Sequence, residues 1–314
     1  MSKVSSQSQV ISIMGPTASG KTGLALELAK QIDCEIISVD SALIYKQMDI
    51  GTAKPSAEEL AQVPHWLIDI VDPVENYSVA EFCQQAFDCI QDIQSRGKVP
   101  VLVGGTMMYF NALINGISKV PETDPLIRQK VNQQALEQGW DKMHAELQDI
   151  DPIVAARVHP NDPQRIGRAI EVFRMTGKNL SYWQAQKSPG LADKLQVPIR
   201  QFAIAPTDRK VLHQRIQARY GQMLDAGFID EVMELRNRGD LNLNMPSMRC
   251  VGYRQVWQYL DNEYEYQEMV EKGVAATRQL AKRQFTWLRS WQSVSWLDTF
   301  GKTNVAKIVG LATI

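Results

Sequence analysis

The amino-acid sequence predicts an α/β fold in which helices flank a parallel β-sheet. Strand-like and helical patterns alternate through residues 10–110, which is typical of this class. The strand-like runs are rich in apolar residues without a strict alternation, and VPVLVGG at 99–105 is apolar throughout, as expected for parallel strands covered on both faces. The third observation is the spacing G-x-x-x-x-G-K-T from Gly15 to Thr22, between a strand and a helix. It narrows the prediction to a P-loop kinase-like sheet.

The predicted elements follow in order along this first part of the chain. The helix after the glycine-rich pattern covers 22–31. Another helix begins near Ser78, where Glu81 completes a capping box, and it ends at Gly97. Four strand-like runs are predicted to belong to one sheet: 10–14, 35–40, 99–106 and, much later, 198–206.

The pattern changes from about Pro121. Residues 121–195 contain no convincing strand and read as several helices, interrupted by DPIVAARVHPNDP and KSPG. We therefore predict an all-helical insertion domain at 121–195, within a catalytic core formed by 1–120 and 196–314. Long helices are expected at about 208–238 and 266–290.

The glycine-rich pattern is typical of a loop that binds phosphate. Glycines let backbone N–H groups turn toward an anion, and the following helix adds the positive end of its dipole. Lys21 is expected to reach the terminal phosphate, and Thr22 to hold Mg²⁺. A chance glycine-rich turn is the less favoured alternative. The predicted loop consists of Gly15, Pro16, Thr17, Ala18, Ser19, Gly20, Lys21 and Thr22.

The third strand lacks the acid that kinases and ATPases place at a strand end to hold Mg²⁺. It ends on Gly104, Gly105 and Thr106, and the nearest acid is Asp40, after the second strand. Because the carboxyl ends of parallel strands meet over one crevice, the P-loop, Asp40 and Thr106 are expected there together. Two structural alternatives stay open: Asp40 as a helix N-cap, and Thr106 as a turn residue.

A carboxylate and a hydroxyl facing a diphosphate favour a reaction in which diphosphate is the leaving group. The P-loop would stabilise the departing charge. Asp40 would take a proton from an incoming nucleophile.

The composition is typical of a globular protein, with 44% hydrophobic and 22% charged residues. The longest apolar runs are too short to span a bilayer, and the polar start MSKVSSQSQ is no signal peptide. The four cysteines lack metal-binding spacing, so we interpret them as reduced thiols in a cytoplasmic protein. Nothing indicates an obligate protein partner or more than a monomer.

The net charge of −1 gives no general sign of nucleic acid, but the local distribution does. Several basic residues lie between Lys272 and Trp296, with no acid before Asp298. This asymmetry predicts a basic surface near the C-terminal end.

These motifs resemble the tRNA dimethylallyltransferases, also called tRNA isopentenyl-diphosphate transferases. The P-loop is shared with many NTPases, whereas DSALIYKQMDIGTAKP and RQLAKRQFTWLR are quite specific. The sequence stops soon after its last long helix, without the C-terminal zinc-finger extension of eukaryotic members, so the bacterial type is expected. The resemblance covers nearly the whole chain, through GPTASGKT, SVDSALIYKQMDIGTAKP, PHWLIDIVDPVENYSVAEF, PVLVGGTMMYFNAL, DPQRIGRAIEVFRMTG, MRCVGYRQVWQYL and ATRQLAKRQFTWLRSW.

The resemblance implies prenyl transfer to tRNA. In that family the P-loop binds the diphosphate of dimethylallyl diphosphate, and Mg²⁺ assists. The prenyl group goes to the exocyclic amine of the adenosine at tRNA position 37, on the 3′ side of the anticodon, and diphosphate leaves. The helical insertion grips the anticodon stem-loop. Carried onto this sequence, the resemblance makes Asp40 the general base, places Thr106 against the reacting base and brings Arg219 near the diphosphate.

The resemblance also implies a set of tRNA-contacting residues. The adenine is expected to leave the stack of the single-stranded anticodon loop, and we predict that Gln47 reads it. The other contacts are expected from Asp40, Ser41, Ala42, Leu43, Thr106, Arg128, Gln164, Arg165, Ile166, Gly167, Arg168, Arg249, Cys250, Val251, Gly252, Tyr253, Arg254, Lys282, Arg283, Gln284, Phe285, Thr286, Trp287, Leu288 and Arg289.

Helical spacing supports part of this set. Arg165 and Arg168 lie three residues apart on one face of a predicted helix that ends at Gly177, which suits contacts to a phosphate backbone. A solvated basic face is the alternative. Trp287 and Trp291 are expected to pack in the core and not to stack on bases.

Three other functions compete with this interpretation. A P-loop kinase acting on a nucleoside or small alcohol with ATP shares the fold but leaves the missing acid and the basic C-terminal helix unexplained. An adenylate isopentenyltransferase acting on free AMP or ADP would have no need of the arginine-bearing insertion. A non-catalytic RNA-binding protein would give Lys21, Thr22 and Asp40 no role.

Overall fold

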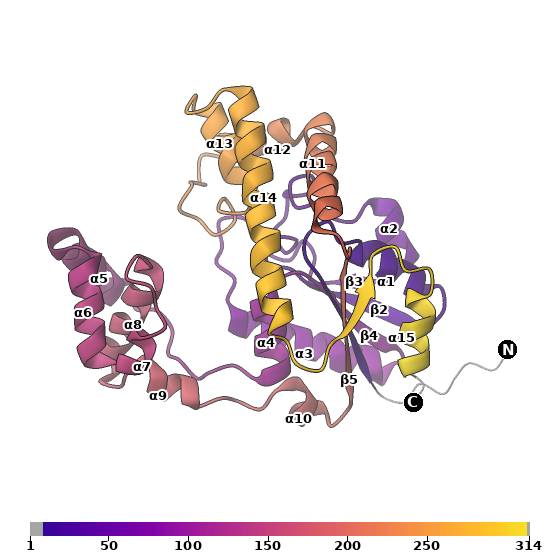
Figure 1. The fold of residues 1–314 in the computed structure, drawn as a ribbon, viewed down its shortest axis with the longest axis horizontal. Helices are drawn as coiled ribbons and strands as arrows, with labels where there is room; N and C mark the ends of the chain where they lie inside the picture. Colours follow the sequence, from indigo (N-terminus) through magenta and orange to yellow (C-terminus); the bar gives the residue numbers. More distant parts are fainter. Residues whose placement is uncertain (1–8, 313–314) are drawn as a thin grey trace. The chain divides into compact units, whose positions relative to one another are not determined.

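The computed structural model of the 314-residue chain describes residues 9–312 and divides the chain into two compact units (Figure 1). The core unit comprises residues up to 114 and from 192 onward, and the insertion unit comprises 115–191. The predicted insertion, 121–195, starts and ends a few residues later. Among the described residues, no helix is long and apolar enough to cross a membrane.

A single sheet of six strands, each parallel to its neighbours, forms the centre of the core unit, in the order β3-β2-β4-β1-β5-β6. The predicted α/β class is therefore confirmed. The sequence patterns missed β3, which has only two residues, and β6, which follows the longest helix after a short turn. The strands are β1 (Val10–Met14), β2 (Cys34–Val39), β3 (His65–Trp66), β4 (Val99–Gly104), β5 (Ile199–Ala205) and β6 (Ser295–Asp298).

Helices cover both faces of this sheet, as its unbroken apolar strands require. Helices α1 (Lys21–Ala29) and α15 (Asn304–Ala312) pack on one face with Ile13 and Val101. Ile37 and Leu102, which are register partners, are also buried, and α3 (Val79–Ser95) packs against β2 and β4. The ring of Phe82 in α3 stacks on Tyr109 of α4 (Met107–Asn115), with ring centroids 4.3 Å apart.

A second hydrophobic cluster joins the later helices of the core unit. Tyr220, Phe228 and Tyr253 pack edge to face at its centre. The helix expected at 208–238 is two helices, because Gly227 adopts a φ of +96° between them. These helices are α11 (Arg209–Asp225), α12 (Phe228–Asn237), α13 (Tyr253–Leu260) and α14 (Tyr266–Arg289), and the unit also contains the short α2 (Ala57–Gln62).

The insertion unit has its own core, which includes Val131, Leu147 and Ile166. No strand occurs in it, since every regular element between 115 and 191 is helical. Asp162 caps α8 by accepting a hydrogen bond from the Arg165 N–H at 3.1 Å, and Gly177 ends this helix, as predicted. The helices are α5 (Pro125–Gln138), α6 (Trp140–Ile150), α7 (Pro152–Ala155), α8 (Pro163–Thr176) and α9 (Leu180–Ala185), with α10 (Leu191–Leu195) at the return to the core unit.

Candidate active site

The phosphate-binding loop connects β1 to α1 and is shaped by its glycines. A Cβ on Gly15 would lie 2.4 Å from the carbonyl oxygen of Ile204 and 2.7 Å from the Ser19 Oγ. Gly20 has a φ of +92°, a conformation that glycine adopts readily. Among the described residues, no side chain caps the N-terminus of α1. Its N–H groups are therefore available to an anion.

Gln284 of α14 holds this loop in place. Its side-chain Oε1 accepts a hydrogen bond from the Thr17 N–H at 2.8 Å, and its Nε2 donates to the Gly105 carbonyl at 2.9 Å. The side chain is buried, with 8% of the residue exposed. Both ends of this amide are therefore used inside the protein, and the contact of Gln284 with tRNA stays a prediction.

Lys21 lies at the first position of α1, and its Nζ donates to the Pro16 carbonyl at 2.8 Å. Burial lowers the pKa of Lys21 to about 8, the nearby Asp40 carboxylate raises it, and the guanidinium of Arg219 lowers it further. Two cations beside one carboxylate leave an excess of positive charge. A bound diphosphate would compensate that charge.

Two arginines of α11, four residues apart, border the phosphate-binding loop. The Nη2 of Arg219 donates a hydrogen bond to the Ala53 carbonyl oxygen, with 3.5 Å between the two atoms. Burial lowers the pKa of Arg219, and the nearby Asp40 carboxylate partly offsets this effect. Arg215 donates from Nε to the Ala18 carbonyl at 2.8 Å. Both line a hollow of about 440 Å³, together with Ser19 and Gly20. The resemblance identified Arg219 only, although the i, i+4 spacing on a helix could have indicated Arg215 as well.

Asp40 and Thr106 follow the ends of two neighbouring strands, and each makes hydrogen bonds to the turn that begins at Ser41. The Asp40 Oδ1 accepts from the Ala42 N–H at 2.9 Å. The Thr106 Oγ1 accepts from the Ser41 N–H at 3.0 Å and donates to the Ser41 Oγ at 3.3 Å. Residues 41–44 form turns and no helix. Asp40 is therefore not a helix N-cap, although its carboxylate does stabilise this turn.

A cavity of about 610 Å³ brings the predicted groups of the core unit together. Four residues of the predicted loop, Gly15, Pro16, Ser19 and Gly20, do not line this cavity. The apolar part of the lining includes Ile36, Ile68 and Val103. The predicted residues in the lining are Thr17, Ala18, Lys21, Thr22, Asp40, Ser41, Ala42, Leu43, Thr106, Arg219, Arg249, Cys250, Val251, Arg283, Gln284 and Trp287.

The segment 249–254 is divided between the cavity and the interior. Arg249, Cys250 and Val251 line the cavity, and burial raises the pKa of Cys250 to about 12, so its thiol stays protonated at neutral pH. Gly252 and Tyr253 are buried, which removes the Tyr253 side chain from direct reach of tRNA. Arg254 is exposed outside the cavity lining.

The run 282–289 at the end of α14 alternates between exposed and buried positions. Leu288 is buried, and Phe285 is half-buried beneath Arg209 and Arg289, each 5.9 Å from its ring centroid. The expectation that Trp287 packs in the core is wrong, since it is 42% exposed and lines the cavity. The exposed residues of the run are Lys282, Arg283, Thr286, Trp287 and Arg289.

Gln47 lies on the surface of the core unit. It is exposed, has a φ of +63°, and its Oε1 accepts a hydrogen bond from Arg238 at 2.9 Å. Gln47 is not part of the cavity lining. In this structure Gln47 therefore binds Arg238 outside the cavity lining, and its role in reading the adenine stays a prediction.

In the insertion unit, the predicted tRNA-contacting residues differ in availability. Arg165 is 72% exposed at its side chain, although its Nε lies 3.5 Å from the Asp162 Oδ2, whereas Ile166 and Gly167 are buried. Arg128 and Arg168 both bind the carboxylate of Glu171, at 2.9 Å and 2.6 Å. Sequence patterns missed Glu171, a buried acid between two arginines.

The fold and this cavity define a P-loop α/β protein that can hold a diphosphate beside a carboxylate and a hydroxyl. The sequence model of the family described as IPP transferase matches residues 43–291. The chain belongs to the IPP transferase family.

Solved structures of this family resemble the chain over most of its length. The full-length tRNA isopentenylpyrophosphate transferase of Bacillus halodurans is 36% identical, with a TM-score of 0.69, covering 98% of this chain and 95% of that one. A tRNA delta(2)-isopentenylpyrophosphate transferase of Staphylococcus epidermidis is 34% identical, with a TM-score of 0.67 and coverages of 97% and 98%. A eukaryotic dimethylallyltransferase acting on tRNA is 25% identical, with a TM-score of 0.77, covering 96% of this chain and 77% of that one.

Proposed function

We propose that this protein is a tRNA dimethylallyltransferase. It transfers the prenyl group of dimethylallyl diphosphate to the exocyclic amine of adenosine 37 in tRNA and releases diphosphate. The observation that carries this proposal is the cavity, in which the P-loop lysine, Asp40 and Thr106 meet Arg249 and Arg283. Membership of the IPP transferase family and the tRNA-modifying activity named for its solved members support it.

The groups in the cavity can divide the reaction between them. The adenine amine forms a bond to the first carbon of the prenyl group as the bond from that carbon to the diphosphate oxygen breaks. Asp40 accepts the proton that the amine loses. Lys21, Arg219 and the N–H groups of the α1 N-terminus stabilise the negative charge on the leaving diphosphate. The apolar side chains of Ile36, Ile68 and Val103 suit the hydrocarbon part of the donor.

Mg²⁺ fits this site only as a partner of the diphosphate. Among residues 9–312, no group of three or more His, Cys, Asp or Glu side chains is arranged to hold a metal. Mg²⁺ commonly takes most of its ligands from phosphate and water, and the exposed Thr22 hydroxyl at the second position of α1 would be its protein ligand. When bound, the ion would neutralise part of the charge that builds up on the diphosphate.

The insertion unit supplies the second substrate-binding surface of the proposal. We assign it to the tRNA anticodon stem-loop, with Arg165 as the most exposed of its three predicted arginine contacts. In the core unit, Arg249 and Arg283 at the cavity suit the phosphates around the extruded base. Action as a cytoplasmic monomer is also part of the proposal.

A kinase is disfavoured, because β4 ends on Gly104 and is followed by Gly105 and Thr106, without a Mg²⁺-binding acid.

The deciding experiment supplies purified protein and Mg²⁺ with labelled dimethylallyl diphosphate and an unmodified tRNA whose anticodon is followed by two adenines. Parallel reactions contain AMP in place of tRNA, or ATP in place of the donor. Label in tRNA is the expected result. Label in AMP would indicate an adenylate isopentenyltransferase, and phosphate transfer from ATP a kinase.

A further inference from the structure

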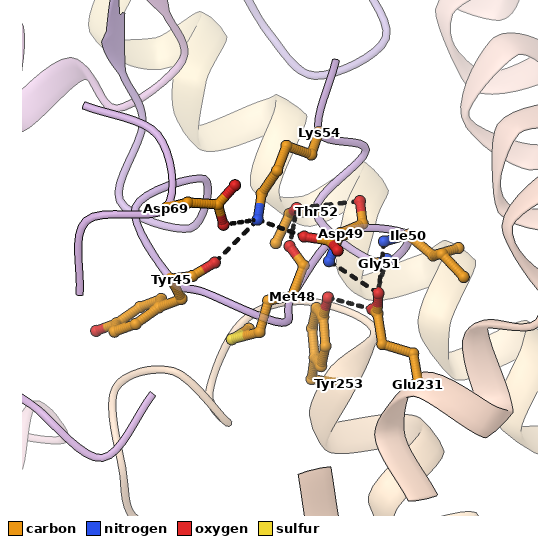
Figure 2. A network of polar contacts seen from close by, with 10 residues as sticks. All are labelled: Tyr45, Met48, Asp49, Ile50, Gly51, Thr52, Lys54, Asp69, Glu231 and Tyr253. Carbon is orange, nitrogen blue, oxygen red and sulfur yellow. Dashed lines mark hydrogen bonds and ion pairs between the residues drawn. The ribbon is translucent and has the colours of Figure 1, made fainter. Parts of the chain in front are cut away.

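The loop that joins β2 to α2 is held by two charged side chains that do not line the cavity (Figure 2). One is Lys54, whose ammonium group donates to the Tyr45 carbonyl at 3.0 Å and binds the carboxylates of Asp49 and Asp69. Its side chain is only 5% exposed. Ala53, next to Lys54, has a φ of +54°, a conformation that surrounding contacts must maintain.

Glu231 of α12 holds the same loop from the other side (Figure 2). Its Oε2 accepts from the N–H groups of Asp49 at 2.8 Å and Ile50 at 2.7 Å. Its Oε1 accepts from the Gly51 N–H at 3.0 Å and the Tyr253 hydroxyl at 2.6 Å. Four donors thus converge on one carboxylate, which has about four acceptor positions.

The Tyr253 contact extends this arrangement to a second wall of the cavity. Gly51, Thr52 and Ala53 line the cavity on one side of Glu231. Cys250 and Val251, shortly before Tyr253, line it as well. Packing is also close here, because a Cβ on Gly51 would lie 2.1 Å from the Phe228 ring and 2.6 Å from the Tyr253 ring.

We propose that Glu231 is a positioning residue that couples these two walls. The wall at 51–53 touches the diphosphate side, because the Ala53 carbonyl lies against Arg219. The wall at 249–251 lies in the segment predicted to contact tRNA. Through Glu231, the conformation of one wall fixes the other, so the fit of the donor depends on a hydrogen bond at Tyr253. This inference rests on the proposed function for the identity of the two substrates.

Two substitutions test the coupling without creating a cavity in the hydrophobic core. Glu231→Gln keeps the size of the side chain but turns one acceptor into a donor that faces N–H and O–H groups. Tyr253→Phe removes one hydroxyl and leaves the three backbone hydrogen bonds of Glu231 in place. The matched controls are Glu234→Gln, an exposed glutamate on the same helix, and Tyr259→Phe, a half-buried tyrosine of α13 outside the network.

The measurement is KM for dimethylallyl diphosphate at saturating tRNA, with kcat and the melting temperature recorded for each variant. Glu231→Gln should raise this KM about tenfold or more, as expected for disrupting hydrogen bonds to a charged group. Tyr253→Phe should raise it in the same direction by a smaller factor, and the controls should match wild type. A lower melting temperature with an unchanged KM in Tyr253→Phe would overturn the proposal, because the contact would then serve stability alone.

A second readout separates this inference from the proposed function. Calorimetric titration with inorganic diphosphate needs no tRNA and no prenyl transfer. If the wild-type protein fails to prenylate tRNA, the proposed function falls, while weaker diphosphate binding in Tyr253→Phe still supports the coupling. Equal diphosphate affinity in the wild-type protein and both variants would overturn the proposed coupling through Glu231.

Discussion

Gln284 and Thr17 are 267 residues apart in the chain and are joined by a hydrogen bond of 2.8 Å. Through this bond, the longest helix of the protein holds the loop that grips phosphate. The other end of the same amide binds the Gly105 carbonyl, beside Thr106. The phosphate-binding loop and the end of β4 therefore share one support, and this support lies in α14.

Replacing Gln284 by Leu should loosen the phosphate-binding loop. The variant leaves the Thr17 N–H and the Gly105 carbonyl without their partner, each at a cost of about 1–3 kcal/mol if it stays buried. We expect a lower midpoint in urea unfolding and a higher KM for the prenyl donor. Gln279→Leu, at an exposed position of the same helix, is the control. A variant that is less stable but keeps the wild-type KM would limit Gln284 to a structural role.

Replacing Asp40 by Asn should strongly slow prenyl transfer while tRNA still binds. The Asn side chain keeps an oxygen for the Ala42 N–H, so the turn at 40–42 is preserved and only the basic carboxylate is lost. Removal of a general base typically lowers the rate about 10²–10⁴-fold. Single-turnover transfer of labelled prenyl group, alongside filter binding of tRNA, measures both properties. Transfer at the wild-type rate would exclude Asp40 as the base.

Local patterns predicted the parts of the site that lie at strand ends. The phosphate-binding loop needs two glycines at fixed spacing, and the carboxyl ends of parallel strands necessarily meet at one edge. Asp40 and Thr106 could therefore be placed at the same crevice from the sequence. Strand-like patterns also predicted four of the six strands, since each of these is at least five residues long and mainly apolar.

Local patterns could not predict the side chains that act at long range. Glu231 binds Asp49 across 182 residues, and nothing near either residue indicates this contact. Trp287 was assigned to the core because an aromatic residue in an amphipathic helix usually packs inward. The cavity that opens beside this part of α14 is lined by segments far away in the sequence, so the exposure of Trp287 follows from the tertiary structure alone.

The lowered pKa of Lys21 leads us to predict an unusual dependence of the free energy of unfolding on pH. Burial lowers its pKa from 10.5 to about 8. Below pH 8 the amine is protonated in both states, and the folded protein carries the full cost of a buried ammonium group. Between pH 8 and 10.5 the unfolded chain keeps the proton that the folded protein has lost, so this cost disappears as the pH rises.

Lys21→Met should therefore melt at a higher temperature than wild type at pH 7, with the gain vanishing as the pH approaches 10.5. Lys30→Met, at an exposed position just after α1, should show no such trend. Saturating inorganic diphosphate should reverse the order at pH 7, because only wild type gains the ion pair with the ligand. Thermal melts of the three proteins over this pH range test the prediction. A gain that does not change with pH would refute it.

Glu171 should control both the stability of the insertion unit and its affinity for tRNA. The residue is 1% exposed, and its carboxylate binds Arg128 and Arg168. Glu171→Gln removes the charge that holds these guanidinium groups, so we expect a lower melting temperature. We also expect tRNA to bind about tenfold more weakly, which is the free energy of about one hydrogen bond to a charged group. KM for the donor should not change, because the cavity is built entirely from residues of the core unit. Filter binding of tRNA and donor kinetics are compared with Glu137→Gln, an exposed glutamate of α5. If the Glu171→Gln protein is less stable but binds tRNA with unchanged affinity, Arg128 and Arg168 stabilise the insertion unit and do not contribute to tRNA binding.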